Sequence, residues 1–97
     1  NFEKEITSPV FYKTNGNFDL GTGKIKNGNV YLCEDGIALI SLDGKPYSYD
    51  EILIKDIDKV EINDFKLKIF TKDNRIFLIT TPDAKKVISS LQDKGWI

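Results

Sequence analysis

Apolar and polar residues alternate along most of this chain in short runs, and turn-forming residues separate the runs. Asparagine, aspartate and glycine favour tight turns because they adopt a positive φ more readily than other residues. Such turn signals recur at 14–17, 26–29, 35–36, 43–44, 63–64 and 72–74. The runs between them are rich in β-branched and aromatic residues, which predicts antiparallel strands without helices between them.

The alternation predicts seven or eight strands in a meander, sandwich or barrel. The expected strands are 5–13, 20–26, 29–34, 37–42, 46–54, 58–63, 65–71 and 75–80. In the last strand, Ile76 and Leu78 form one apolar set, and Phe77 and Ile79 form the facing set. Apolar residues on both faces of a strand indicate that both faces are covered. We therefore expect the last two strands to be covered on more than one side.

The period changes in the last segment of the chain, where a helix is expected. Thr81-Pro82-Asp83 is typical of a helix start, with threonine as N-cap and proline at the first helical position. Gly95 supplies the left-handed stop, and Trp96 follows it. Helical spacing places four apolar residues in one stripe, Ala84, Val87, Ile88 and Leu91. The fold class is therefore mostly β, with one amphipathic C-terminal helix.

The composition indicates one ordinary globular domain over residues 1–97. The 97 residues are 40% hydrophobic and 30% charged, enough for one core without metal or disulfide support. No apolar run approaches the ~20 residues of a membrane-spanning helix. Fourteen basic residues stand against fifteen acidic ones, and Arg75 is the one arginine. This balance argues against a nucleic-acid partner, because such partners select basic surfaces.

Residues suited to catalysis are scarce. The sequence has no histidine, so the usual general base and the commonest metal ligand are missing. Cys33, the one cysteine, is interpreted as a small buried residue of a strand rather than a reactive thiol. We predict that the chain is not an enzyme, has no cofactor or metal, and resides in the cytoplasm, where thiols stay reduced. Abundant Lys, Ile, Asn and Asp favour an archaeal or bacterial source.

Three other groups of residues are better explained by structure than by chemistry. The acidic run over 50–64 lacks the spacing of a calcium loop and is interleaved with lysines, which indicates a solvated edge. The stretch 21–24 lacks the spacer of a phosphate loop and precedes a strand, which favours a bend. Five aromatic residues could form a recognition patch but are more often core in strands. They are Tyr12, Tyr31, Tyr47, Tyr49 and Trp96.

Three stretches carry a resemblance to the pleckstrin-homology (PH)-like superfamily. Residues 18–22 followed by 30–40 resemble the early "G-T-x-x-x-T-x-x-R-L" meander, and 54–62 resembles the "I-x-x-I-x-x-V-x-x" corner. The terminal helix ending in Gly95-Trp96 is similar to the closing helix of GLUE domains, which belong to the ESCRT-II complex. GRAM, prokaryotic PH-like domains and the N-terminal domain of the archaeal taxis adaptor CheF look similar as well. The resemblance implies a bent β-sandwich plugged at one end by the helix.

The resemblance implies a non-catalytic module that binds a protein partner, with ubiquitin or an ESCRT or adaptor subunit as candidates. We expect contact at Trp96, beyond the helix stop, and at the hairpin around Asn63, Asp64 and Phe65. The alternative for Trp96 is that it packs onto the sheet.

The second hypothesis is a module at the membrane surface that binds anionic lipid headgroups. Its candidate residues are Lys13, Lys24 and Lys26, in what we expect to be the loop between the first two strands. This loop departs from the Lys- and Arg-rich loop of phosphoinositide-binding PH domains, because it has no arginine and includes Asp19. In this reading the domain lies in the cytoplasm, peripheral to the membrane.

Overall fold

The structure is a computed structural model that describes residues 6, 8–19, 23–43 and 48–96. In this part of the chain, seven strands are followed by one α-helix, and a short 3₁₀ turn, η2 (Ile54–Asp56), joins the fourth strand to the fifth. The strands are β1 (Val10–Asp19), β2 (Ile25–Cys33), β3 (Gly36–Ser41), β4 (Ser48–Leu53), β5 (Ile57–Asn63), β6 (Lys66–Thr71) and β7 (Ile76–Thr80). The helix is α1 (Ala84–Asp93).

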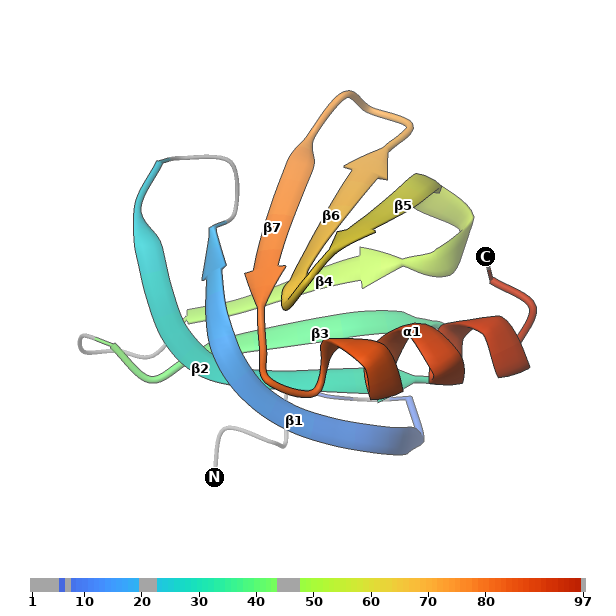
Figure 1. Cartoon of the computed structure of the whole chain (residues 1–97), viewed down its shortest axis with the longest axis horizontal. Coiled ribbons are helices and arrows are strands. Elements are labelled where there is room, and N and C mark those ends of the chain that lie inside the picture. Colours follow the sequence, from blue (N-terminus) through green and yellow to red (C-terminus); the bar gives the residue numbers. More distant parts are fainter. Residues whose placement is uncertain (1–5, 7, 20–22, 44–47, 97) are drawn as a thin grey trace.

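The strands form one antiparallel sheet in the order β4-β3-β2-β1-β7-β6-β5. The sheet is strongly bent, so that β5–β7 fold over β2–β4, and α1 lies along one open end (Figure 1). Strand β1 makes the connection, because it pairs with β2 along most of its length and with β7 at its last residues, Asn17–Asp19. The predicted sandwich of antiparallel strands capped by a C-terminal helix is confirmed.

The first two strands are longer than expected, and two predicted Asn-Gly turns are wrong. Gly16 and Gly28 lie opposite each other in the continuous ladder between β1 and β2. A Cβ atom at Gly16 would overlap the carbonyl oxygen of Thr80, and one at Gly28 would overlap that of Ile40. Glycine is needed here because two backbones approach closely where the strands bend, and not because a turn requires a positive φ.

The same bend explains why two of the expected strands are observed as one. The expected strands 20–26 and 29–34 correspond to one strand, β2, so the described chain has seven strands, the lower of the two predicted numbers. From β3 onward, each described strand lies within two residues of its expected position. Residues 5, 7, 20–22 and 46–47 of the expected strands lie outside the described residues.

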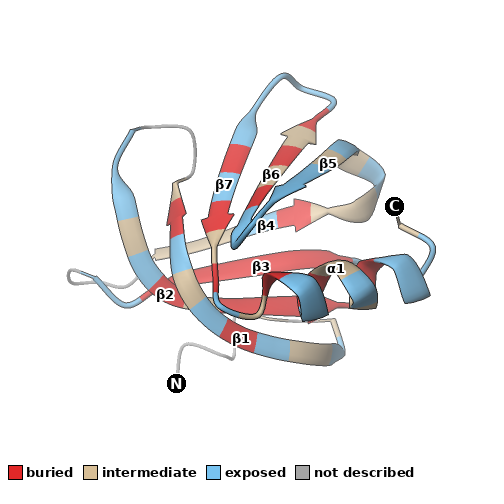
Figure 2. Cartoon of the chain, in the orientation of Figure 1, coloured by how far each residue is buried: buried red, intermediate tan, exposed pale blue. Residues whose placement is uncertain are grey.

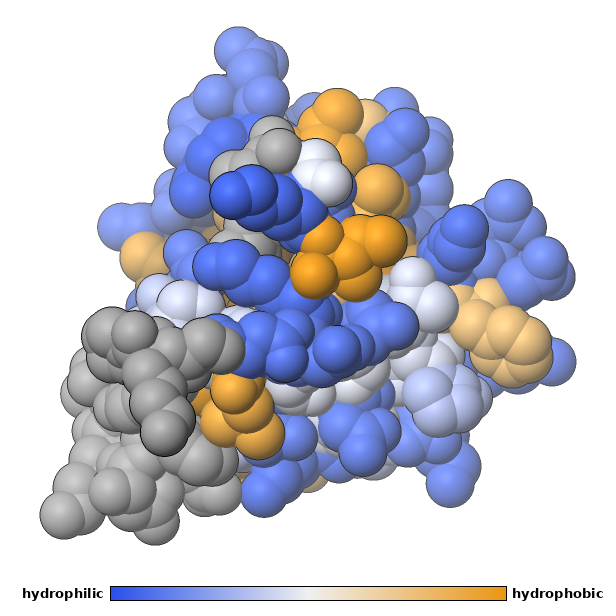
Figure 3. Space-filling view, turned by 90° about the vertical axis from the view of Figure 1, so that its left-hand side faces the viewer, coloured by the Kyte–Doolittle hydropathy of each residue, from blue (hydrophilic) through white to orange (hydrophobic). Residues whose placement is uncertain are grey.

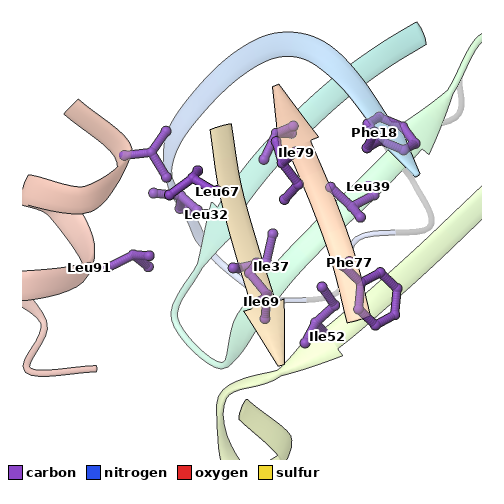
Figure 4. Close-up of a cluster of buried hydrophobic side chains, with 12 residues drawn as sticks. Phe18, Leu32, Ile37, Leu39, Ile52, Leu67, Ile69, Phe77, Ile79 and Leu91 are labelled. Carbon is purple, nitrogen blue, oxygen red and sulfur yellow. The ribbon is translucent and has the colours of Figure 1, made fainter. Parts of the chain in front are cut away.

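The helix begins later than expected but packs as predicted. Its first residue is Ala84, and the Thr81 hydroxyl accepts the Asp83 N–H (3.2 Å) in the preceding turn. Gly95 adopts a φ of 75° and ends the helix. Ala84, Val87 and Leu91 are buried, and Ile88 is half-buried against the core. Figure 4 shows Leu91 pointing from α1 toward the strands, so the helix closes the mouth of the sandwich.

Two apolar clusters lie on opposite faces of β2 and β3. The main core fills the space between the two halves of the bent sheet and includes Leu32, Ile37, Leu39, Ile69 and Phe77 (Figure 4). A second cluster, which we call the outer cluster, lies on the other face and consists of Tyr31, Cys33, Ala38 and Ile40. Ile6 and Tyr49 pack against the outer cluster. Strand β3 is therefore buried along its whole length (Figure 2).

The outer face of β7 is open, and the expectation that both of its faces are covered is wrong. Phe77 and Ile79 point into the core, whereas Ile76 and Leu78 are 40% and 39% exposed. The neighbouring strand β6 buries Leu67 and Ile69 in the same way. Two-sided burial thus occurs at β2 and β3, while β7 keeps apolar side chains at the surface.

Candidate binding surface

Trp96 packs against the sheet beside the end of α1. Its ring lies edge-on to Phe11, with 5.9 Å between the ring centroids, and it is half-buried against the main core. The Lys94 ammonium lies 4.6 Å from the centroid of Phe11 and donates to the Glu34 carboxylate at 3.0 and 3.1 Å. These contacts fix the helix end to β1 and to the turn between β2 and β3.

The hairpin that follows β5 lies at the opposite end of α1. Asp64 has a φ of 53°, as a two-residue turn between β5 and β6 requires. The carbonyl oxygen of Phe65 accepts the N–H of Thr81 (2.9 Å), just before the helix, and the Phe65 side chain is 60% exposed. A ten-residue helix is about 15 Å long. The structure therefore separates Trp96 from the hairpin instead of joining them in one site.

The three candidate lysines are only partly brought together. Lys13 lies within β1 rather than in a loop, opposite Tyr31, and its Nζ lies 5.4 Å from that ring centroid. Lys26 lies opposite Phe18, five residues farther along β1, or roughly 17 Å at ~3.4 Å per residue. The Lys26 Nζ donates to the Ser48 hydroxyl (3.3 Å). Lys24 and Lys26 thus lie near one end of β1, and Lys13 lies apart from them.

Three adjacent hollows of about 250–260 Å³ each meet at one residue, Lys66. One is formed at the end of β1 and β7, one at the β5–β6 hairpin, and one over the last residues of β5. We call this combined area the Lys66 surface. Its main residues are Ile25, Ile62, Phe65, Lys66, Leu78 and Thr80.

The strand register explains why these residues meet. Lys66 lies opposite Thr80 on one side, and Thr80 lies opposite Asn17 of β1. On the other side, Lys66 lies opposite Asn63 of β5. Four strands therefore contribute one row of side chains to the same face, since paired residues of neighbouring strands point the same way. Leu78 belongs to the next row of this face, opposite Lys68 and Asp19.

The Lys66 surface gathers most of the exposed apolar bulk. In the described ranges, seven large hydrophobic residues are exposed, and four of them line this surface. They are Ile25 (72%), Phe65 (60%), Ile62 (45%) and Leu78 (39%). Figure 3 looks onto the side where β1 and β2 are connected and shows apolar side chains among hydrophilic ones in its centre and upper part. A gathering of this kind is typical of an interaction surface.

Charged groups surround the apolar residues, and most have partners. Glu61 forms an ion pair with Lys59 (3.6 Å), and the Asp19 carboxylate accepts the N–H of Gly23 (3.1 Å). The Lys66 ammonium differs, because no described carboxylate lies within ion-pair distance of it. The surface thus presents an available cation at the meeting point of its hollows.

Other ionisable groups of the sheet are shifted by burial. Burial in the outer cluster raises the pKa of Cys33 to about 11, and the nearby Asp35 and Glu51 add to the shift. Burial also raises the pKa of Tyr49, whose hydroxyl donates to Glu51 (2.7 Å). In the part of the chain that the structure describes, three or more His, Cys, Asp or Glu side chains nowhere gather as metal ligands would. No described helix is long and apolar enough to cross a membrane.

Comparisons with known proteins identify the fold. No protein-family model and no curated protein matches the sequence. The chain is similar to the C-terminal domain of an unknown protein from Leishmania infantum, with a TM-score of 0.75 and 17% identity over 98% of this chain and 90% of that one. It is also similar to the linker-DH/PH domains of p115-RhoGEF, with a TM-score of 0.67 and 8% identity, over 97% of this chain but only 31% of that one.

At these identities the likeness shows the fold alone. The chain has a PH-like fold, a bent antiparallel β-sandwich capped by a C-terminal helix, as the sequence resemblance implied. Neither likeness distinguishes the GLUE, GRAM and prokaryotic PH-like families from one another.

Sequence reasoning found one part of the Lys66 surface and missed the rest. Asn63, Asp64 and Phe65 were expected to bind and do line one hollow. Lys66, Leu78 and Ile25 were missed because the pairings that join them link residues far apart in the chain. The sequence did contain one signal. Leu78 is an apolar residue on the second face of β7, and no segment of the chain was identified that would cover that face.

Proposed function

We propose that this chain is a non-catalytic interaction module that binds a segment of a protein partner on the Lys66 surface. One observation carries the proposal: four of the seven exposed large hydrophobic residues of the described chain line one continuous set of hollows. Burying these side chains against a partner would release apolar surface from water at roughly 25 cal/mol per Å². Phe65 has the size and position of a central anchor.

A protein partner fits this surface better than a lipid bilayer does. The surface is hollowed and carries both Glu61 and Asp64 beside its lysines, and such carboxylates oppose adsorption to an anionic membrane. Ubiquitin and an ESCRT or adaptor subunit are the defined candidates, because the chain resembles GLUE domains. The half-buried Trp96 is a separate candidate contact, at the other end of α1.

The proposal can be tested without knowing the partner. Peptides selected from a displayed random library on the folded domain, and ubiquitin itself, are titrated into the ¹⁵N-labelled domain. We expect binders to shift the amide signals of residues on the Lys66 surface, and to lose affinity for Leu78→Asp. Leu42→Asp is the matched control, because Leu42 is 50% exposed but lines none of the three hollows. Binders that shift signals elsewhere and ignore Leu78→Asp would refute the proposal.

A membrane-surface function is the second candidate, and one feature favours it. Ile25 is the most exposed large hydrophobic residue of the described chain, and Lys24 and Lys26 flank it. An apolar side chain between two cations suits shallow insertion into an anionic bilayer. Sedimentation with phosphatidylcholine vesicles containing phosphatidylserine tests this at low and high salt. Binding that fades with salt and with Ile25→Ser would support the membrane function, whereas no sedimentation at low salt would exclude it.

A further inference from the structure

The Lys66 ammonium occupies an unusual place for a surface cation. It lies where three hollows meet, and two exposed apolar residues lie beside it, Phe65 on the hairpin and Leu78 on β7. Two carboxylates that line these hollows are held by other groups, since Glu61 pairs with Lys59 and Asp19 accepts a backbone N–H from Gly23. A third, Asp64, lines the hollow at the hairpin and forms no ion pair with a described residue. In the described residues, Lys66 itself forms no ion pair.

This arrangement has a consequence for any apolar partner. A segment that covers Phe65 and Leu78 also removes water from Lys66 between them. A charge that loses its water without gaining a partner opposes binding strongly, whereas a carboxylate at hydrogen-bond distance compensates for the lost solvation. The surface therefore discriminates against partners that are purely apolar or basic and in favour of partners that bring a negative charge.

The size of the surface limits the length of the partner segment. The hollows extend across β5, β6, β7 and the end of β1, four neighbouring strands. Three intervals of about 4.8 Å give a width of roughly 14 Å. An extended segment covers this width with about four or five residues, at 3.3–3.6 Å per residue.

We propose that the partner of the Lys66 surface is a short acidic–apolar protein segment, in which one Asp or Glu pairs with Lys66 while flanking apolar side chains fill the hollows beside Phe65 and Leu78. This inference rests on the proposed function and adds the chemistry of the partner. It assigns to Lys66 the role of selecting charge, and to Phe65 and Leu78 the role of supplying apolar contact.

The test repeats the peptide selection on three forms of the domain: the natural sequence, Lys66→Glu, and Lys86→Glu. Lys86 is exposed on α1 and lines none of the three hollows, so its variant makes the same change in net charge elsewhere. Thermal unfolding confirms that each form is folded. Peptides from the natural domain should share one Asp or Glu between apolar residues, and Lys66→Glu should select Lys or Arg at that position. Lys86→Glu should retain the acidic preference.

Binding measurements make the expectation quantitative. An acidic peptide should lose at least about tenfold in affinity for Lys66→Glu, and change by less than about twofold for Lys86→Glu. Peptides without a preferred charge, or an acidic preference that Lys66→Glu leaves unchanged, would overturn the inference while the proposed function stands. Selection that yields only peptides bound away from Leu78, or no peptide at all beside binding to anionic vesicles, would refute the proposed function as well.

Discussion

The outer faces of the two halves of the sheet differ, although their apolar patterns are alike. On β2 and β3 the outward residues Tyr31, Cys33, Ala38 and Ile40 are at most 3% exposed. On β7 the outward residues Ile76 and Leu78 are about 40% exposed. Both sets alternate with residues of the main core, so the local sequence pattern does not distinguish them.

The difference lies in what the rest of the chain supplies to each face. Ile6 and Tyr49 pack over the outer cluster, so the chain itself covers β2 and β3. The outer face of β7 has charged neighbours on β6, such as Lys66 and Lys68, and keeps its apolar residues in water. Burial of the outward apolar residues of β2 and β3 already stabilises the fold, whereas those of β7 can still be buried by a partner.

The largest effect is expected from thiol chemistry at matched positions. Cys33 in the covered face should react with a thiol reagent roughly a thousandfold or more slowly than in the unfolded chain, because burial protects it and raises its pKa to about 11. A cysteine introduced as Leu78→Cys, in a Cys33→Ala background, should react nearly as fast as an unfolded thiol. The rates are followed by mass spectrometry. Similar rates at the two positions would abolish the distinction between the faces.

Truncation of apolar side chains should give the next largest difference. Ile40→Ala removes a fully buried side chain and should lower the free energy of unfolding by about 2–5 kcal/mol. Leu78→Ala removes a side chain that is already 39% exposed and should cost less, about 1 kcal/mol. Urea denaturation measures both. Equal losses would show that Leu78 is as well covered as Ile40.

These two residues also show how far the sequence predicts the molecule. Alternation correctly assigned Phe77 and Ile79 to one face and Leu78 to the other, because residue parity is a local property of a strand. Whether another segment covers a face depends on contacts between distant residues, so the burial of Ile40 and the exposure of Leu78 could not be told apart. The bend at Gly28 was missed for the same reason, because it depends on the close approach of the β3 backbone at Ile40.

The site was predictable to the same limited extent. Phe65 was recognised because a turn with an aromatic residue is a local signal. Lys66 was not, because its importance comes from the pairing of β6 with β7 and of β7 with β1. Trp96 was assigned to the same contact as the hairpin, although the length of α1 separates them.

One substitution tests the close approach of β2 and β3 at Gly28. Gly28→Ala places a methyl group against the carbonyl of Ile40 and should destabilise the fold by roughly 1–3 kcal/mol or more. Asn27→Ala, one residue earlier with an exposed side chain, serves as the control and should change stability by no more than about 0.5 kcal/mol. Chemical denaturation gives both values. A neutral Gly28→Ala would contradict the close approach of β2 to β3.

The smallest effect is expected at Asp50, a carboxylate on the edge strand β4, which pairs with β3. Burial raises the pKa of Asp50 on β4, although Lys26 and Arg75 act in the opposite direction. The folded state therefore holds this proton more tightly than the unfolded state, and stability falls as the pH rises from the unfolded pKa of about 3.9 through the folded pKa. Asp50→Asn should raise the melting temperature at pH 7, and the gain should disappear near pH 3. A gain that is independent of pH would contradict burial as the cause.

One outer face of the sheet is covered by the chain itself, whereas the other is open to solvent. Methyl NMR in the presence of a soluble paramagnetic agent tests this difference most directly, because relaxation of each methyl reports its access to solvent. We expect strong relaxation at Ile25, Ile76 and Leu78 and little at Ile40, and we expect a bound acidic–apolar peptide to protect Ile25 and Leu78 but not Leu42. Relaxation at Ile40 as strong as at Leu78, or a bound peptide that leaves Leu78 fully accessible, would contradict the account.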